Sequence, residues 1–516
     1  MGSRMMRNWW TGSLMVLLVM SPLARVRAEA RAAGAATLVD AIKSEDRTAV
    51  RALLQRRADV NAPEPDGTTA LHWAVHMDDV GTAELLIGAG ANPKAANRHR
   101  VTPLALAATN GNAAMIGLLL KAGADPNTAL PEGETALMTA ARTGKLDAVK
   151  VLLETGANVN VKEASRGQTA LMWAAAEGHA AVVEALTRQG ADIGARSTGG
   201  LTALLFAVRE GKIETVRALL KAGANVNDVT IRPPGITRTS VPGYALGQRP
   251  QGSTSALALA VGSAHFELAS VLLEEGADPN AAAQGWTALH EMTWVRKCGQ
   301  GDNNPCPRGT GAMDSLELAR RLVAHGANVN ARMTQKASMG TTELGNLGAT
   351  PFLLAARTAD VELMRLLVKS GADPLLPNDD LTTPLMAAAG CGTYSPGEDP
   401  GIESEALEAV KLAWELGGDV NTVDEKGDTA MHGAAYKFFP SVVRFLAEKG
   451  ARVEIFNYQD EFGFDPLTIA EGVLRAPTGT GDHFRVSEET AAAIREVMKG
   501  AAPGKGSVLG CRECVK

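Results

Sequence analysis

The chain of 516 residues is poor in aromatic residues and cysteines and has no long hydrophobic run. Aromatic residues make up only 4% of the chain, which favours thin, closely packed helices rather than a thick globular core. The apolar stretch at residues 14–20 is much shorter than the roughly 20 residues that span a bilayer. The sequence therefore argues against a permanent membrane anchor.

Sequence motifs of common catalytic sites are also missing. The chain has no Gly-x-Ser-x-Gly elbow, no phosphate-binding loop and no Gly-x-Gly-x-x-Gly after a strand, and His290-Glu291 lacks the second His of a zinc helix. The net charge is −6, whereas nucleic-acid-binding proteins are usually basic. We therefore expect a protein that is not an enzyme, holds no cofactor or metal, and does not bind nucleic acid.

One tetrad of the form Thr-Ala-Leu-His recurs ten times between residues 69 and 432, mostly at a spacing close to 33 residues. The copies begin at Thr69, Thr102, Thr135, Thr169, Thr202, Ser255, Thr287, Thr350, Thr383 and Thr429. An apolar helix and a Gly-Ala-Asp/Asn-x-Asn phrase follow most copies, as at residues 156–160. The chain is thus an array of similar units.

The residue types in one unit predict its local structure. Thr or Ser is a favoured helix N-cap, and Ala or Pro suits the first helical turn, so each tetrad is expected to begin a helix. The Gly of the later phrase can take the left-handed conformation that ends a second helix, and the Asn is typical of turns. A helix pair this short cannot cover its own apolar side, so leucines such as Leu71 and Leu104 must pack against neighbouring units.

These motifs resemble the ankyrin repeat family over nearly the whole chain. The resemblance implies a mostly α solenoid with β-hairpin finger loops, about ten repeats plus terminal caps, and a concave face of fingers and first helices that binds a protein partner. It also implies structural roles for His72, His290 and His432, because the family places a hydrogen-bonding His at the fourth tetrad position. Together with an N-terminal export signal, the chain is similar to exported bacterial ankyrin repeat proteins.

The N-terminus has the pattern of a secretory signal peptide. Arg4 and Arg7 precede the apolar stretch, and Val26-Arg-Ala28 is a small-residue cleavage site, so residues 1–28 are expected to be removed. No Cys follows the apolar stretch, which argues against a lipoprotein. We expect a periplasmic or secreted protein without a membrane contact after cleavage.

The register of the tetrads divides the rest of the chain. The expected segments are an N-terminal half-repeat cap at 37–66, repeats 1–5 at 67–227, an inserted finger loop at 228–252, repeats 6–10 at 253–462, a divergent repeat and C-terminal cap at 463–499, and a tail at 500–516. Three further insertions, at 296–312, 332–347 and 391–403, interrupt repeats 6–10.

All five cysteines fall in insertions or in the tail, and Cys391, which begins one insertion, has no obvious partner. In an oxidising compartment, Cys298 and Cys306 could close a disulfide within one insertion, or remain as two thiols. Cys511 and Cys514 form a Cys-x-x-Cys that lacks the His needed for covalent haem attachment. One interpretation of this motif is a disulfide, either local or between two chains; a disulfide between chains would make a dimer of an otherwise monomeric protein. The alternative is a redox, metal or haem-linked carrier.

Long insertions in an otherwise minimal array are usually functional or disordered. The first insertion carries Arg232, Arg238, Tyr244 and Arg249 and has no acidic residue after Asp228. With Trp294, these residues are our candidates for binding a partner. The hypothesis is a non-catalytic scaffold that binds a protein through its concave face and the loops of repeats 5–9, with the alternative that the loops are spacers.

Overall fold

The computed structural model describes residues 37–231, 253–297, 307–336, 344–393, 401–461, 463–472 and 486–499. Residues 37–198 belong to one compact unit, and the described residues from 199 onward belong to a second. The described residues contain 25 helices and no β-strand, so the expected α-solenoid fold is confirmed.

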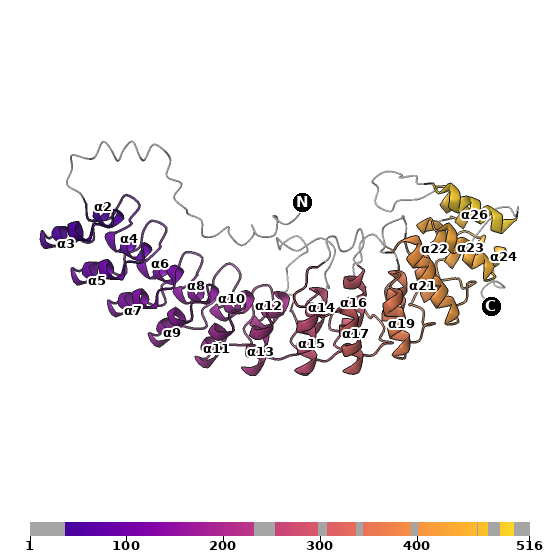
Figure 1. Ribbon diagram of the computed structural model, residues 1–516, viewed down its shortest axis with the longest axis horizontal. Helices are drawn as coiled ribbons and strands as arrows, with labels where there is room; N and C mark the ends of the chain where they lie inside the picture. Colours follow the sequence, from indigo (N-terminus) through magenta and orange to yellow (C-terminus); the bar gives the residue numbers. More distant parts are fainter. Residues whose placement is uncertain are drawn as a thin grey trace. The chain divides into compact units, whose positions relative to one another are not determined.

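The first unit consists of five helix pairs (Figure 1). Its helices are α2 (Leu38–Lys43), α3 (Arg47–Gln55), α4 (Ala70–His76), α5 (Val80–Gly88), α6 (Pro103–Asn110), α7 (Ala113–Lys121), α8 (Ala136–Arg142), α9 (Leu146–Glu154), α10 (Ala170–Glu177) and α11 (Ala180–Arg188). Each helix contacts its pair mate, and the first helices α4, α6, α8 and α10 contact one another in chain order. The contacts are therefore between neighbouring pairs, as in other repeat arrays.

The second unit continues the same pattern up to a C-terminal group of shorter helices. Its helices are α12 (Ala203–Arg209), α13 (Ile213–Lys221), α14 (Ala256–Gly262), α15 (Phe266–Glu274), α16 (Ala288–Arg296), α17 (Ser315–Ala324), α18 (Pro351–Arg357), α19 (Val361–Lys369), α20 (Pro384–Ala389), α21 (Glu403–Glu415), α22 (Ala430–Lys437), α23 (Pro440–Glu448), α24 (Val453–Phe456), α25 (Pro466–Ala470) and α26 (Glu488–Met498). Helix α26 packs on α23 and α25 and covers the end of the described array.

The tetrads begin the first helices because their Thr or Ser caps them. The hydroxyl of Thr102 accepts a hydrogen bond from the amide of Ala105 at 3.3 Å, and Ser255 does the same for Ala258 at 3.2 Å. Such a cap contributes about 1 kcal/mol. Gly178, with φ of 91°, ends α10 in the left-handed conformation that a side chain would strain.

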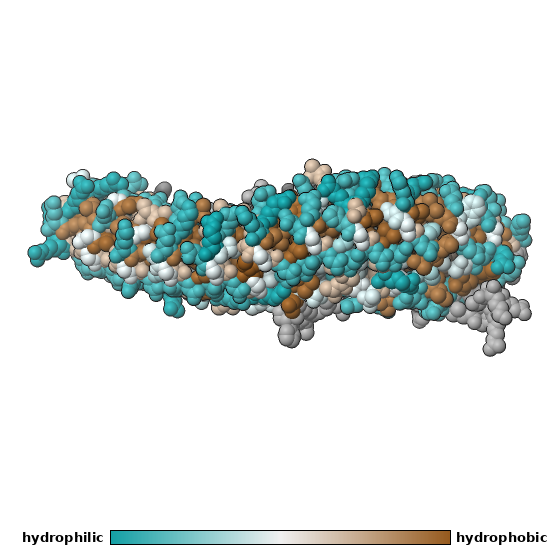
Figure 2. Space-filling model, turned by 90° about the horizontal axis from the view of Figure 1, so that it is seen from below, coloured by the Kyte–Doolittle hydropathy of each residue, from teal (hydrophilic) through white to brown (hydrophobic). Residues whose placement is uncertain are grey.

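The core is a row of small apolar contacts inside each unit. The third residue of the tetrads is buried in every repeat, with Leu71 and Leu137 exposed by 1% or less. In the second unit the same position is occupied by Phe352, which is also fully buried. On the face drawn in Figure 2, hydrophobic residues lie in narrow strips broken by hydrophilic ones in both units.

The described finger loops are built from turns. Two isolated antiparallel bridges, Ala129 with Thr135 and Val229 with Ser255, are the only strand-like pairs in the described residues. Loop hydrogen bonds close the fingers instead, as between the amide of Glu64 and the carbonyl of Thr68 at 2.8 Å. The β-hairpin form of the fingers and the number of repeats stay predictions.

An asparagine at the base of most fingers joins each finger to the next. In the second unit, Asn330 donates through Nδ2 to the carbonyl of Gly371 at 3.2 Å and accepts through Oδ1 from the amide of Asp373 at 2.8 Å. Asn421 makes the equivalent pair of bonds to Gly450 and Arg452. Between these two asparagines the equivalent position is occupied by Leu375, whose side chain cannot make such bonds.

Replacing Leu375 by asparagine should therefore stabilise the second unit. Leu375 is 47% exposed and lies beside Gly417, the residue that corresponds to Gly371 and Gly450. Two new hydrogen bonds at a partly exposed site should raise the free energy of unfolding by about 1 kcal/mol. Urea denaturation followed by circular dichroism measures this. The matched variant Asn330→Leu should lower stability by a similar amount, and equal midpoints for both variants would contradict the prediction.

Candidate protein-binding surface

The residue that follows each tetrad occupies the same place on each first helix. We call these residues the first-helix row: Trp73, Leu106, Thr139 and Trp173 in the first unit, and Phe206, Leu259, Glu291, Leu354, Ala387 and Gly433 in the second. Several row residues, including Trp73, Leu106 and Trp173, are only half-buried, although most of the surrounding helix is buried. A partner can therefore reach apolar and aromatic side chains at the half-buried row positions, whereas row residues such as Phe206, Leu354 and Ala387 are buried.

At the start of the first unit, Trp73 is enclosed by charged side chains. Its indole Nε1–H donates to Glu64 at 2.5 Å, and Lys43 Nζ lies 4.2 Å from the ring centroid. Lys43 and Glu64 are themselves paired at 2.6 Å. A cation over an indole adds about 0.5–1 kcal/mol at such exposed sites, so this tryptophan is held in one orientation.

Trp173 is arranged in a similar way, with one difference. The Arg142 guanidinium lies 4.7 Å from the ring centroid and pairs with Glu134 at 3.3 Å. The Glu134 carboxylate also accepts the hydroxyl of Thr139, a row residue, at 2.7 Å. Within the described residues, however, the buried Nε1–H of Trp173 has no hydrogen-bond acceptor.

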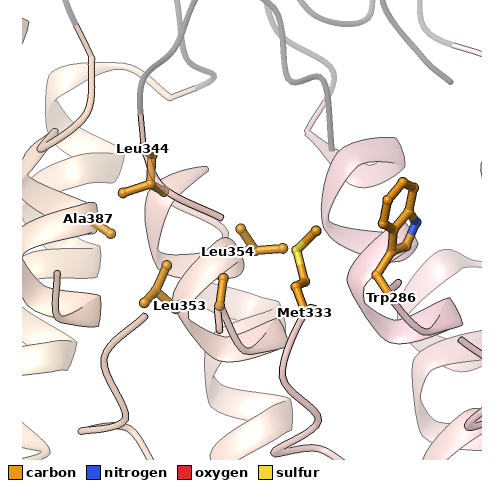
Figure 3. Packing of buried hydrophobic residues seen from close by; sticks show 7 residues of the cluster. Trp286, Met333, Leu344, Leu353, Leu354 and Ala387 are labelled. Carbon is orange, nitrogen blue, oxygen red and sulfur yellow. The ribbon is translucent and has the colours of Figure 1, made fainter. Parts of the chain in front are cut away.

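In the second unit, two tryptophans meet at helix α16, and Figure 3 shows one of them, Trp286, with the buried cluster to which it belongs. Trp286, in the finger before the helix, contacts Trp294 edge to face, with 5.3 Å between the ring centroids. Trp286 belongs to a buried cluster with Met333, Leu344 and Leu354, against which the half-buried Trp294 packs. The insertion at 332–347 supplies two of these residues, so its described ends form part of the core.

The backbone also fixes the described ends of this insertion. The amide of Met333 donates to the carbonyl of Ala349 at 3.0 Å, and the amide of Gly348 donates to the carbonyl of Met333 at 2.8 Å. The amide of Thr334 reaches back to the carbonyl of Gly285 in the preceding finger at 2.8 Å. The insertion therefore begins and ends as an ordered part of two neighbouring fingers.

Glu291 is the acidic member of an otherwise mostly apolar row. Burial raises the pKa of its carboxyl to about 7, and the indole of Trp286, which donates to it at 2.7 Å, opposes this rise in part. Burial also lowers the pKa of the neighbouring His290 to about 4. Near neutral pH, a large fraction of Glu291 is therefore protonated and can donate a hydrogen bond.

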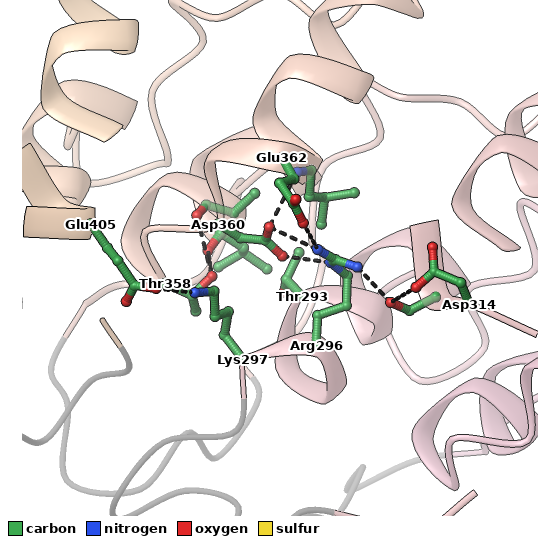
Figure 4. Close-up of polar contacts among 12 residues, drawn as sticks. Thr293, Arg296, Lys297, Asp314, Thr358, Asp360, Glu362 and Glu405 are labelled. Carbon is green, nitrogen blue, oxygen red and sulfur yellow. Dashed lines mark hydrogen bonds and ion pairs between the residues drawn. The ribbon is translucent and has the colours of Figure 1, made fainter. Parts of the chain in front are cut away.

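The insertion at 296–312 starts from a buried ion pair (Figure 4). Arg296, at the end of α16, binds Asp360 through two nitrogens, with distances of 2.6 and 3.1 Å. The side chains are 9% and 1% exposed. Lys297 follows and pairs with Glu405 of α21 at 2.6 Å.

The other end of this insertion is attached to an earlier repeat. The amide of Thr310 donates to Nδ1 of His265 at 3.1 Å, and the amide of Ala312 lies 3.4 Å from a carboxylate oxygen of Glu267. Because the start contacts α19 and α21 and the end contacts α15, the described ends are fixed by three different helix pairs.

The three tetrad histidines have the structural role that the resemblance implies. In each, Nδ1 accepts the amide of the capping Thr, and Nε2 therefore donates to a carbonyl of the following finger. His72 reaches Val101 at 3.1 Å, His290 reaches Ala349 at 3.1 Å, and His432 reaches Tyr458 at 3.0 Å. In the part of the chain that the structure describes, no group of three or more His, Cys, Asp or Glu residues is arranged to hold a metal.

The candidate residues from the sequence are placed only in part. Arg232, Arg238, Tyr244, Arg249, Cys298, Cys306, Cys511 and Cys514 lie outside the described residues. Trp294 lies within the described residues; it is half-buried and packs beside Trp286. Sequence reasoning missed Glu291, Arg296 and Asp360. Glu291 could have been found, because it is the one carboxyl in a row of mostly apolar residues. Cys391 is a buried free thiol.

Stacked pairs of short capped helices, held by contacts between neighbouring pairs, define a helical-repeat protein. Overlapping stretches at residues 38–129, 80–163, 104–197 and 163–230 match the family model of ankyrin repeats in three copies. Residues 347–379 match the model of a single ankyrin repeat. The chain belongs to the ankyrin repeat family, whose repeats are protein-binding elements. None of the described helices is long and apolar enough to cross a membrane.

A short stretch is similar to a curated protein of Caenorhabditis elegans. It is 44% identical over 62 residues to the ankyrin repeat and LEM domain-containing protein 1 homolog. The match covers 12% of this chain and 9% of that protein. The likeness is therefore confined to a small number of repeats.

Proposed function

We propose that the protein is a non-catalytic scaffold of the periplasm or cell exterior that binds a protein partner through the first-helix row and the inserted loops of repeats 5–9. The observation that supports this most is the anchoring of two insertions. The ion pair of Arg296 with Asp360 and the packing of Met333 and Leu344 fix the described ends beside the row. A loop whose ends are fixed in this way loses less conformational entropy when it binds a partner.

The row itself has the composition of a binding surface. Indoles and aliphatic side chains provide buried contact area, and the nearby Arg142 and Arg209 provide directional hydrogen bonds. Arg209 lies 5.1 Å from the ring centroid of Phe206, another row residue. In each unit taken by itself, a partner segment along the row would meet an aromatic ring beside a cationic group: Trp173 with Arg142 in the first, and Phe206 with Arg209 in the second.

Affinity capture from an extract of the exporting organism tests this proposal. The bait is residues 29–516 tagged ahead of residue 37, and retained proteins are identified by mass spectrometry and then purified for a direct binding measurement. We expect one stoichiometric partner, whose affinity falls at least tenfold when residues 233–250 are replaced by a short Gly-Ser linker. As a control, the exposed outer-helix variant Lys150→Ser should bind normally.

Two further results would count against the proposal. Unchanged affinity after the loop replacement would remove the loop from the binding site, and retention only in non-reducing buffer would move the function to Cys511 and Cys514. Export is checked separately by N-terminal sequencing of the protein from a periplasmic fraction, where the chain should begin at Glu29. A chain that keeps residues 1–28 in the cytoplasm would contradict the proposed location.

A further inference from the structure

One histidine of the second unit joins an insertion to two neighbouring repeats. His265 directly precedes α15, and its Nε2 lies 3.0 Å from the carbonyl oxygen of Arg209, the last residue of α12. Its Nδ1 faces the described end of the insertion at 296–312, residues 307–312, which we call the docked end. The amide of Thr310 donates to this nitrogen at 3.1 Å. The histidine is only 5% exposed, so the contact lies at the edge of the core.

These contacts require one form of the imidazole. A backbone amide only donates, so Nδ1 must have a free lone pair, and a carbonyl only accepts, so Nε2 must carry the proton. The Thr310 hydroxyl, 3.1 Å from Nδ1, can donate or accept, but the amide cannot change its role. A second proton, on Nδ1, would point at the amide hydrogen of Thr310. The docked end is therefore compatible with neutral His265 only.

Glycines allow the docked end to approach this closely. A Cβ on Gly309 would overlap the carbonyl oxygen of Ala264, which lies in the turn between α14 and α15. A Cβ on Gly211, in the turn between α12 and α13, would lie 2.5 Å from Oγ1 of Thr310. A side chain at either position would push the two backbones apart. The local sequence is therefore suited to this contact on both sides.

A histidine at the same place in the first unit shows which contact the insertion adds. His179 directly precedes α11, and its Nε2 lies 2.9 Å from the carbonyl oxygen of Arg142, the last residue of α8. In the part of the chain that the structure describes, no residue donates to Nδ1 of His179. The bond of Nε2 is thus common to both histidines, whereas the bond of Nδ1 in His265 belongs to the insertion.

We propose that His265 is a pH-sensitive attachment point, which holds the docked end while its imidazole is neutral and releases it when Nδ1 gains a proton. The start of the same insertion is held by the ion pairs of Arg296 and Lys297, which involve no histidine. Acid would therefore free one end of the insertion and leave the other attached. The device is independent of the partner proposed above.

Other ionisable groups lie on the segments that meet at His265. They are Arg209, Glu210 and Lys212 at the turn after α12, Glu267 on α15, and Arg308 and Asp314 in or next to the docked end, whereas α14 carries none. Burial lowers the pKa of His265 below its ordinary value of 6.5, and the bond to the Arg209 carbonyl opposes this. Of the charges, Glu210 raises the pKa and Lys212 lowers it. The net shift favours the neutral form that the geometry requires.

The sign of the pH dependence follows from proton linkage. Release exposes Nδ1 to water, so the released state binds a proton more readily than the docked state. Docking is therefore lost as the pH falls from the ordinary pKa of 6.5 to the lowered native value. Within this window the release equilibrium changes by up to tenfold per pH unit.

Nuclear magnetic resonance of the full chain between pH 7.5 and pH 4.5 tests the attachment. Nitrogen-15 in threonine and histidine reports the Thr310 amide and the imidazole nitrogens, and the variant Thr310→Ser identifies the amide signal. At pH 7.5 we expect neutral His265 with its proton on Nε2. As the pH falls, exchange of the Thr310 amide, corrected for its intrinsic pH dependence, should rise by up to tenfold per pH unit in step with protonation of His265.

Two variants separate the histidine from the insertion. His265→Gln has no titrating proton, so the pH dependence at Thr310 should disappear, although Glu291 still titrates in this range. Gly309→Ala should release the docked end at every pH and move the titration midpoint of His265 upward, because Nδ1 then meets water. The control is His179→Gln, which removes the equivalent histidine of the first unit and should leave both observations unchanged.

Two results on the unmodified protein would overturn the proposal without any need for stable variants. One is a Thr310 amide that stays protected while His265 becomes protonated. The other is neutral His265 with its proton on Nδ1, because this form cannot accept the Thr310 amide. An unchanged pH dependence at Thr310 in His265→Gln, or its loss in His179→Gln, would equally overturn it.

Discussion

Replacement of Asp360 by alanine is expected to lower the free energy of unfolding of the second unit by about 3–5 kcal/mol. The change leaves the Arg296 guanidinium, of which 9% is exposed, without its bidentate partner, and loss of one member of a buried ion pair costs this much. Glu362 remains 3.3 Å from Arg296, but it is largely exposed and cannot replace the buried carboxylate. The variant also loses the N-cap of α19, where Asp360 accepts the amide of Leu363.

An ion pair of the same geometry in the first unit shows how much of this cost comes from burial of the charges. Arg47 binds Asp79 through two nitrogens, and Asp79 caps α5, but the Arg47 side chain is 64% exposed. Asp79→Ala should therefore cost only about 1 kcal/mol, mostly from the lost cap. Urea unfolding monitored by circular dichroism, with hydrogen exchange to locate the loss, measures both. Similar costs for the two variants would show that burial of Arg296 does not govern the effect.

The second large effect concerns Glu291 and depends on pH. Its pKa of about 7 in the native protein, against 4.5 in the unfolded chain, means that the native state holds an extra proton between these values. Stability is therefore lost as pH rises from about 4.5 to 7. Glu291→Gln keeps an oxygen for the indole of Trp286 but has no proton to lose. At pH 8 it should be more stable than the original protein by up to about 3 kcal/mol, and at pH 4 no more stable.

His290 has the opposite pH dependence. Because its native pKa is about 4 and its unfolded value 6.5, stability is lost as pH falls from 6.5 to 4. This contribution is common to the original protein and Glu291→Gln, so it cancels when their unfolding midpoints are compared at each pH. The exposed Glu415→Gln serves as the control and should show no such difference. An equal gain for Glu291→Gln at pH 4 and pH 8 would contradict the titration of Glu291.

The repeated part of the fold could be predicted because its chemistry is local. A Thr directly before a helix, as at Thr102, specifies a cap because its hydroxyl accepts the amide of the residue three positions later. The tetrads therefore located the first helices, and the breaks in their register located the insertions. The contacts of the insertions could not be predicted in this way. Arg296 meets Asp360 across 64 residues, and no local pattern relates them.

The candidate site was predicted less completely than the fold. Trp294 was a candidate for partner binding, and the structure shows that it packs against Trp286. A role for it in partner binding stays a prediction, as do those of the arginines and Tyr244 in the first insertion. Glu291 was missed because a single acidic residue on a helix usually faces water, and only the structure shows that it is half-buried and accepts the indole N–H of Trp286.

The attachment of the insertion at 296–312 suggests a use in protein engineering. Lys297 and Thr310 are fixed by Glu405 and His265, which are residues of other repeats and do not belong to the segment between them. The sequence of residues 298–306 can therefore be randomised while the described contacts at both ends are retained. A library made in this way would display variable peptides from a defined base, and selection could redirect the scaffold to a chosen target.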